Sequence, residues 1–299
     1  MTESRPRFDL VTVGAYTKDT IVSKAGTRYV DGGGYSYAAH AAKLAGLDVA
    51  AVTRLAPDDR RSTQLLVDAG VTVVVHECDA STLMRLEYPT DNVDERVLTV
   101  TAVAEPFEPA HLRGIDARAF LLSASIRGEV SIEVVRALKA TGALIGADVQ
   151  GFVRVVGAGG QLEYVAWPEQ RDVLALVDVL KTDAVEAEFL TGESDIHRAA
   201  ATLAAQGPNE VVLTHKDGVL VWAKGVVHEA GFFPEPLRGR SGRGDTCIGS
   251  YLARRLDAEP GEATVWAAAV TSLKMEAEGP IRRPVADVHA KVARSYGQA

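Results

Sequence analysis

The 299-residue sequence contains only two cysteines, Cys78 and Cys247, and seven histidines that show no metal-ligand spacing. Two cysteines cannot form a disulfide framework or a cysteine-based zinc site, and free thiols fit a reducing cytoplasm. No stretch approaches the ~20 apolar residues of a membrane span, and a strand-like run follows residues 1–7 where a signal peptide would have its apolar core. We therefore expect a cytoplasmic protein without a membrane partner.

Positive charge is also scarce, since 32 Lys and Arg stand against 40 Asp and Glu, with a formal net charge of -8. This balance argues against a general nucleic-acid-binding surface, although a local site could still bind a small anion. Hydrophobic residues make up 47% and charged residues 24%, as in ordinary globular proteins. Because neither a low-complexity linker nor a long repeat divides the chain, we expect one domain over residues 1–299.

Two common catalytic signatures are missing. The sequence has no Gly-x-x-x-x-Gly-Lys-Ser/Thr loop, which excludes a P-loop enzyme, and no Gly-x-Ser-x-Gly nucleophile elbow. The glycines at 157–160 resemble a nucleotide-binding fingerprint, but strand-like residues 161–165 follow them where the fingerprint requires a helix. We interpret residues 157–160 as a hairpin turn.

Apolar periodicity predicts alternating strands and helices over most of the chain. The predicted strands cover residues 8–14, 49–53, 71–75, 119–122, 143–147, 177–180 and 211–213. The predicted helices cover residues 35–44, 62–69, 132–140, 185–190, 197–205, 245–256 and 262–277. This alternation is typical of a mostly parallel sheet with helices on both faces. Residues 15–31 and 83–103, the latter with a turn at 89–94, are β-like and predict a small β-lid beside that sheet.

The most informative stretch is residues 239–256, in which Gly242, Arg243, Gly244 and Asp245 precede an amphipathic helix. Glycines before a helix expose backbone N–H groups, and the helix dipole favours negative charge at the same place. A carboxylate on the first turn can reach that place and take a proton from a hydroxyl during phosphoryl transfer. The alternative is a plain turn with an acidic helix start.

Two further stretches lie at predicted strand ends, where open α/β sheets bind ligands. Residues 181–192 run from a strand into a helix and carry Asp183 and Glu186, which could equally be a solvated acidic helix start. Residues 214–218 join two strands and could equally be an ordinary hairpin turn. Taken singly, each motif favours its ordinary interpretation, and only the ordered set points to a function.

That ordered set resembles the ribokinase-like (PfkB) family of small-molecule kinases. It consists of a Gly-Gly pair near the N-terminus, Lys-x-Asp-x-x-Glu, Thr-x-x-x-Gly and Gly-x-Gly-Asp, and it covers nearly the whole chain. The resemblance implies a three-layer α/β/α sandwich with a mostly parallel sheet and a small β-lid. It also implies that Gly242 and Gly244 form an anion hole and that Asp245 is the base. Arg243 stands where the family usually has alanine, and could place charge at the phosphates or point to solvent.

The same resemblance implies a donor side and an acceptor side. ATP would be bound by Lys181, Asp183, Thr214, Lys216 and Gly218, and Mg²⁺ by Glu186. The acceptor would be bound by Asp19, Gly32 and Gly33, with Tyr37 where the family usually has asparagine. Residues 148–154 resemble the Asp-x-Gln-Gly-Phe-x-Arg stretch of myo-inositol kinase and its relatives, which adds Gln150 and Arg154. Both of these side chains suit a ring of hydroxyl groups.

We expect an ATP- and Mg²⁺-dependent kinase that phosphorylates a hydroxyl of a small polyol, such as myo-inositol or a sugar, under a lid that excludes water. One alternative is a nucleoside kinase of the same family, since Tyr35, Tyr37 and Tyr88 could stack a base. Another is a non-catalytic sugar or nucleotide sensor, since residues 239–243 depart from the family pattern. A small sheet is marginal alone, so we also expect a homodimer through the lid.

Overall fold

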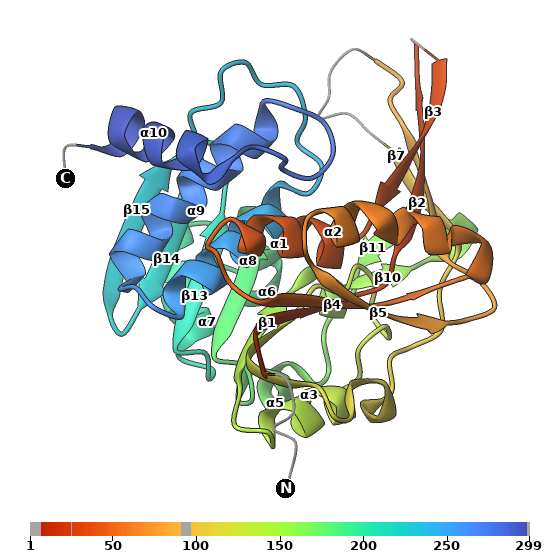
Figure 1. The fold of residues 1–299 in the computed structure, drawn as a ribbon. Helices are drawn as coiled ribbons and strands as arrows, with labels where there is room; N and C mark the ends of the chain where they lie inside the picture. Colours follow the sequence, from red (N-terminus) through yellow and green to blue (C-terminus); the bar gives the residue numbers. More distant parts are fainter. Residues whose placement is uncertain (1–6, 25, 91–96, 298–299) are drawn as a thin grey trace, which may run out of the picture.

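A computed structural model describes residues 7–24, 26–90 and 97–297 (Figure 1). Parts of the expected domain, residues 1–6 and 298–299, and of the expected lid, residues 25 and 91–96, lie outside the described residues. The described chain forms a nine-stranded sheet in the order β15-β14-β13-β12-β9-β8-β1-β4-β5. Its neighbouring strands are parallel except for the pairs β13–β14 and β14–β15. The predicted mostly parallel sheet is confirmed.

The strands of this sheet are short and mostly apolar. Every residue of β4, which lies between β1 and the edge strand β5, is buried, because parallel strands between two helical layers bury both faces. The sheet consists of β1 (Arg7–Val13), β4 (Val49–Leu55), β5 (Thr72–Glu77), β8 (Asp116–Leu122), β9 (Leu144–Asp148), β12 (Val179–Asp183), β13 (Glu210–Thr214), β14 (Gly218–Ala223) and β15 (Val226–Gly231).

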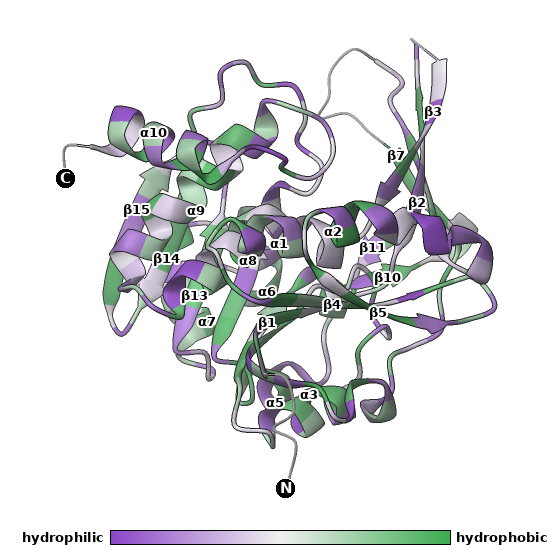
Figure 2. Ribbon diagram, viewed as in Figure 1, coloured by the Kyte–Doolittle hydropathy of each residue, from purple (hydrophilic) through white to green (hydrophobic). Residues whose placement is uncertain are grey.

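Helices cover both faces of the sheet, whose strands are coloured largely as hydrophobic in Figure 2. One apolar core joins the sheet to α1 (Gly34–Lys43), α2 (Gln64–Asp68), α8 (Arg243–Arg255) and α9 (Pro260–Met275). The core on the other face includes α3 (Ile132–Lys139), α4 (Gln150–Val153), α5 (Gln170–Leu174), α6 (Ala184–Thr191) and α7 (Ile196–Ala204). The 3-10 helices are η1 (Pro57–Thr63), η2 (Pro109–Leu112) and η3 (Ala158–Gly160). The three-layer sandwich is therefore confirmed.

A second, four-stranded sheet stands beside the first, in the order β3-β2-β6-β7. It is built from β2 (Thr17–Ser23), β3 (Gly26–Gly32), β6 (Thr82–Glu87) and β7 (Val97–Ala102). The β6–β7 pair is antiparallel, as the turn expected at 89–94 requires; the β2–β3 pair is also antiparallel, whereas the central β2–β6 pair is parallel. Strands β10 (Arg154–Val156) and β11 (Leu162–Tyr164) form a hairpin, which confirms the predicted turn at 157–160. Val156 and Leu162 of this hairpin pack against the apolar side of the four-stranded sheet.

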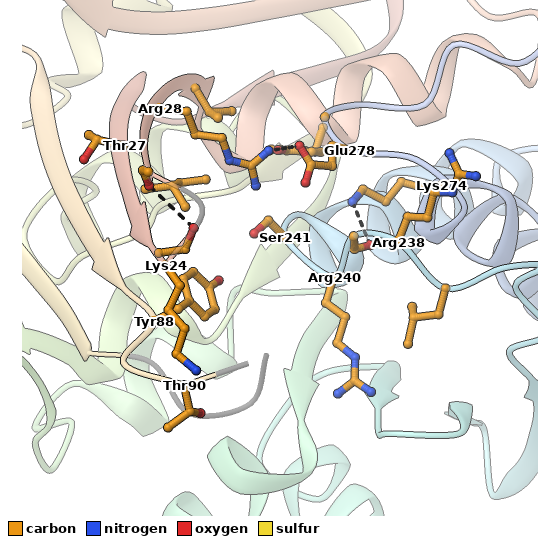
Figure 3. A pocket seen from close by; sticks show the side chains of 18 residues that line it. Lys24, Thr27, Arg28, Tyr88, Thr90, Arg238, Arg240, Ser241, Lys274 and Glu278 are labelled. Carbon is orange, nitrogen blue, oxygen red and sulfur yellow. Dashed lines mark hydrogen bonds and ion pairs between the residues drawn. The ribbon is translucent and has the colours of Figure 1, made fainter. Parts of the chain in front are cut away.

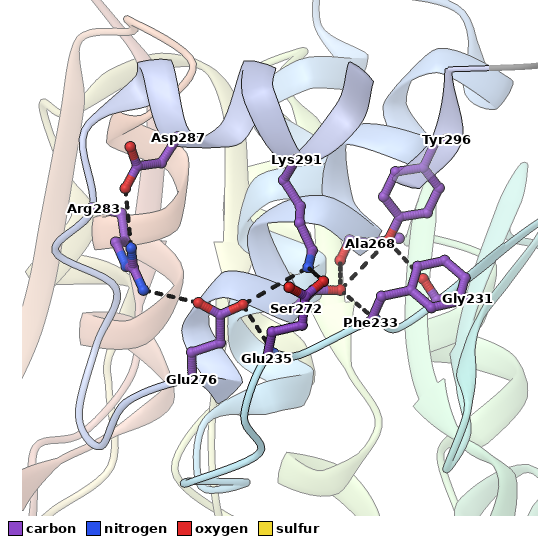
Figure 4. A network of polar contacts seen from close by, with 10 residues as sticks. All are labelled: Gly231, Phe233, Glu235, Ala268, Ser272, Glu276, Arg283, Asp287, Lys291 and Tyr296. Carbon is purple, nitrogen blue, oxygen red and sulfur yellow. Dashed lines mark hydrogen bonds and ion pairs between the residues drawn. The ribbon is translucent and has the colours of Figure 1, made fainter. Parts of the chain in front are cut away.

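The last helix, α10 (Val285–Tyr296), was not predicted from the sequence and packs on α9. An ion network around the buried Lys291 joins it to the chain that precedes α8 (Figure 4). Lys291 Nζ lies 3.1 Å from Glu235 Oε1 and 3.8 Å from Glu276 Oε1. The Glu235 N–H donates to Glu276 Oε1 at 3.1 Å, and Arg283 pairs with the same carboxylate at 2.8 Å. These contacts fasten α10 to α9.

Candidate active site

The N-terminus of α8 begins at a glycine that no other residue could replace without strain. Gly242 has φ = +73°, and a Cβ there would collide with the ring of Tyr37 on α1. The Arg243 N–H already donates to the Arg240 carbonyl at 3.1 Å. An anion at this helix start would therefore use the next N–H groups of the first turn, together with the helix dipole.

Asp245 lies on this first turn and points at the start of α1. The residue is half-buried, and its Oδ1 is inaccessible to solvent without a hydrogen-bond partner among the residues that the structure describes. A Cβ at Gly34 would collide with this oxygen, so the two helix starts meet at the carboxylate. Burial raises the pKa of Asp245, while the cations Lys181 and Arg154 oppose that shift. A buried carboxylate with an unused oxygen has the character of a general base.

Lys181 and Asp148 form a buried ion pair next to Asp245, with 3.1 Å between Nζ and Oδ2. Lys181 on β12 is the register partner of Asp148 on β9, so the sheet itself places them side by side. Burial alone would lower the pKa of Lys181, but Asp148 and Glu186 raise it above its ordinary value. A Cβ on Gly244 would lie 2.7 Å from Lys181 Nζ, which places this cation beneath the helix start.

Glu186 is fully buried and serves the start of α6 in a capping box with Asp183. The Glu186 N–H donates to Asp183 Oδ1 at 2.8 Å, and the Asp183 N–H donates to Glu186 Oε2 at 2.9 Å. Arg154 Nη2 pairs with Glu186 Oε1 at 3.0 Å, so the structure joins an expected acceptor residue to the expected metal ligand. Within residues 7–24, 26–90 and 97–297, no group of three or more His, Cys, Asp or Glu could hold a metal ion.

Four of the expected acceptor residues lie at the start of α1 and on the adjoining strands of the small sheet: Asp19, Gly32, Gly33 and Tyr37. A Cβ at Gly32 would lie 3.1 Å from Asp19 Oδ2, and Gly33 has φ = +109° at the N-cap of α1. Tyr37 is buried, and its pKa is raised by burial and by the carboxylates of Asp19 and Asp245. Asp19, Tyr37 and Asp245 therefore surround one place.

Gln150 begins α4, where its backbone N–H donates to Asp148 Oδ1 at 3.1 Å. Its position ties the expected acceptor motif 148–154 to the buried Lys181–Asp148 pair. The described side-chain contacts give no further role to Gln150.

The expected nucleotide strand end has an exposed turn. Thr214 is buried, and its Oγ1 donates to the Thr182 carbonyl at 3.5 Å. The Lys216 side chain is 84% exposed and lies 3.7 Å from Asp217. Gly218 is buried against the Ala230 carbonyl, so its lack of a side chain serves the packing of β14 on β15. The turn reaches solvent at Lys216.

Arg243 lies beside the ring of Phe232, with 6.0 Å between the guanidinium carbon and the ring centroid. It is half-buried. The guanidinium thus stays close to the helix start and rests on an aromatic face, a favourable place for a cation.

A cavity of ≈ 640 Å³, lined in part by Tyr37, opens between the small sheet and the segment before α8 (Figure 3). Lys274 and Glu278 are among the lining residues that sequence reasoning missed. The sequence signal for Lys274 was a single lysine within the apolar residues of the predicted helix 262–277. Glu278 forms an ion pair with Arg28 of β3, which joins the small sheet to the end of α9.

Comparisons with known proteins show the family and the fold of the chain. The family model for the pfkB family carbohydrate kinases matches residues 8–286. No match is found among curated proteins. A pyrophosphate-dependent kinase in the ribokinase family, solved with a pyrophosphate analog and myo-inositol, is 30% identical over 94% of this chain and 99% of its own, with a TM-score of 0.86.

Two further solved structures are similar. One is a pyrophosphate-dependent myo-inositol-1 kinase converted into a myo-inositol-3 kinase, 30% identical over 96% of this chain and 99% of its own, with a TM-score of 0.86. The other is the ribokinase of Arabidopsis thaliana with ribose and ATP, 19% identical over 96% of this chain and 99% of its own, with a TM-score of 0.76. The latter likeness concerns the fold alone. The described residues include no helix long and apolar enough to cross a membrane.

Proposed function

The chain belongs to the pfkB family of carbohydrate kinases and is a phosphotransferase that acts on a hydroxyl group, and from this membership we propose that it phosphorylates a cyclitol of the myo-inositol type with pyrophosphate as donor. The observation that carries the proposal is the unused, inaccessible Oδ1 of Asp245 at the start of α8. It provides a proton acceptor next to the place where N–H groups and a helix dipole favour phosphate.

In this reaction the acceptor hydroxyl gives its proton to Asp245 as its oxygen forms a bond to phosphorus. The bridging P–O bond of the donor breaks, and phosphate leaves. The first turn of α8 and the ammonium of Lys181 beneath Gly244 lie where they can stabilise the charge of the transferred group. Asp148 keeps Lys181 charged and in place.

Pyrophosphate is the proposed donor because the site offers cations and backbone N–H groups. A donor without a base or a sugar to pack against the protein must gain its affinity from such groups. Arg243 adds a cation at the helix start, and its guanidinium covers one face of Phe232. Two solved relatives that are 30% identical to this chain are pyrophosphate-dependent kinases. ATP, which the sequence resemblance implied, is the competing donor.

Magnesium fits the site only together with the donor. Glu186 already accepts from Arg154 and from the Asp183 N–H, and Mg²⁺ commonly uses one or two carboxylates plus phosphate oxygens and water. Glu186 and Asp183 are the residues that would hold it, and the ion would neutralise phosphate charge.

The four-stranded sheet β3-β2-β6-β7 is proposed as the lid that closes over the acceptor and excludes water. Its apolar side is partly covered by the β10–β11 hairpin near β6 and β7, so a homodimer through the lid would use the other half of the sheet, the edge strand β3 and its neighbour β2. Light scattering at micromolar concentration tests the dimer, and an active particle with the mass of one chain would remove it.

The proposal is tested by incubating the protein and Mg²⁺ with pyrophosphate or ATP and, in turn, myo-inositol, other cyclitols, ribose and nucleosides. Formation of a phosphate monoester is followed by ³¹P NMR, which is not confused by donor hydrolysis. We expect monoester from a cyclitol with pyrophosphate. A faster reaction with ATP would replace the donor, a faster reaction with a nucleoside would replace the acceptor, and no monoester from any pair would favour a non-catalytic sensor.

A further inference from the structure

Three lysines are buried in this protein, and one of them lacks an acidic partner. Lys181 and Lys291 each lie within ion-pair distance of two carboxylates. Lys274 on α9 is only 1% exposed, yet no carboxylate pairs with it among the described residues. Its Nζ donates to the Gly239 carbonyl at 3.3 Å. A buried ammonium with one neutral hydrogen-bond partner is costly, so its presence requires a reason.

The place of Lys274 suggests that reason. Its Nζ lies 5.5 Å from the ring centroid of Tyr37 and lines the cavity in Figure 3, facing the space between α9 and the small sheet. Gly239, which accepts its hydrogen bond, begins the 239–242 turn that leads into α8. The backbone N–H of Gly239 also donates to Met275 at 3.1 Å. The end of α9 therefore holds this turn from two sides.

The charged and titratable groups around Lys274 come from several elements. Burial lowers the pKa of Lys274 to about 8, while Asp245 on α8 and Glu278 after α9 oppose that shift. Tyr37 faces it from α1. Arg28 lines the same cavity from the small sheet but is engaged by Glu278.

The segment before α8 adds Arg238 and Arg240 to the lining. In Figure 3 the Arg240 side chain extends away from Lys274. At neutral pH, Lys274 is a buried cation whose charge interacts with the carboxylate of Asp245.

We propose that Lys274 is a positioning residue of the phosphoryl transfer. Its ammonium holds the Gly239 carbonyl, and through it the turn that presents the first N–H groups of α8, while its charge favours the ionised form of Asp245. The inference rests on the proposed function and deepens it, since it assigns part of the anion site to a residue on a different helix. Loss of the charge should affect turnover more than acceptor binding.

The test compares Lys274→Met and Lys274→Arg with the wild type in the monoester assay. Lys139→Met is the matched control. Lys139 is a half-exposed lysine of α3 that pairs with Asp178 at the N-terminal end of β12, whereas the candidate site lies at the C-terminal end of that strand. We expect Lys274→Met to lower kcat about 10²-fold, the size typical of losing one electrostatic contact at a transferring group, with KM for the acceptor changed little. Lys274→Arg should keep much of the activity because it keeps the charge.

The pH profile separates a charge effect from a packing effect. Wild-type kcat should fall as the pH rises above the Lys274 pKa of about 8. That fall should move to higher pH in Lys274→Arg, because arginine stays protonated, and should disappear in Lys274→Met. An active wild type with Lys274→Met within threefold of it, or with identical pH profiles in all variants, would overturn this inference alone. A wild type that forms no monoester would overturn the proposed function and this inference with it.

Discussion

Lys181 and Lys274 have the same side chain and nearly the same burial, 4% and 1% exposed, yet replacement by methionine should change stability in opposite directions. Methionine keeps the length and apolar stem of lysine, so each variant chiefly removes the charge. Lys181 leaves behind the buried carboxylates of Asp148 and Glu186. Removing one partner of a buried pair typically costs about 3–5 kcal/mol, and we expect Lys181→Met to destabilise the protein by that order.

Lys274→Met should stabilise the protein. The folded-state pKa of Lys274 is about 8, against an ordinary lysine pKa of 10.5 in the unfolded chain. At about 1.4 kcal/mol for each pH unit, the buried charge costs the wild type about 3 kcal/mol at neutral pH. The variant also loses the hydrogen bond to Gly239, which costs about 1 kcal/mol. The free energy of unfolding of Lys274→Met should therefore exceed that of the wild type by about 2 kcal/mol.

The pH dependence gives this prediction a sign that packing alone would not produce. Between the folded and the unfolded pKa of Lys274, the unfolded wild type binds more protons, so its stability rises with pH. The advantage of Lys274→Met should therefore be largest below pH 8 and disappear above pH 10.5. Urea unfolding of both variants and the wild type at several pH values measures it. A Lys274→Met variant less stable than the wild type at pH 7, or a Lys181→Met variant more stable, would refute the reasoning.

Two further predictions concern Gly34 at the start of α1 and the buried Glu129. Gly34→Ala places a methyl group against Asp245 Oδ1 and 2.9 Å from the Ser123 carbonyl. Because a misplacement of a reacting group by one ångström can lower the rate about 10²-fold, we expect kcat to fall by that order. The circular dichroism spectrum should stay native. Activity within threefold of the wild type would contradict it. Burial raises the pKa of Glu129 to about 7, so the folded protein binds the extra proton and stability should fall as the pH rises from 4.5 to 7. Glu129→Gln should remove this slope in urea unfolding, and an unchanged slope would show that another group causes it.

The motif at the start of α8 could be predicted from the sequence because its residues are contiguous. Gly242 and Asp245 need only one turn and one helix to take their places, and the spacing of the helix was readable. The observed α8 and α1 begin within two residues of the predicted helices. Local geometry therefore carried this part of the site.

The ion pairs Lys181–Asp148 and Arg154–Glu186 could not be predicted in the same way. Lys181 meets Asp148 because β9 and β12 are neighbours in the sheet, although other elements separate them along the chain. Arg154, which resemblance assigned to the acceptor, turns to Glu186 because the strand after α4 carries it there. Such partners depend on strand order and on the path of the chain after each strand.

Lys274 and α10 show a second limit. The sequence shows a lone lysine in an apolar helix but does not indicate which groups its side chain contacts. Only the packing of α9 against the turn before α8 shows that the ammonium of Lys274 donates to the Gly239 carbonyl. Helix α10 and strand β15 went unpredicted, although α10 adds the buried Lys291 and its ion pairs to the layer around α9.

The most direct test of the account is the turnover of Asp245→Asn with pyrophosphate, Mg²⁺ and the best cyclitol, followed by ³¹P NMR. Asparagine keeps the size of the side chain but cannot take the proton, and loss of a general base typically lowers the rate about 10²- to 10⁴-fold. Asp287→Asn is the matched control, since Asp287 is also an acid on the first turn of a helix, on α10. The account predicts a loss of that size for Asp245→Asn with little change in donor affinity, and none for Asp287→Asn. An Asp245→Asn variant that keeps more than half of the wild-type turnover would show that this carboxylate only begins a helix.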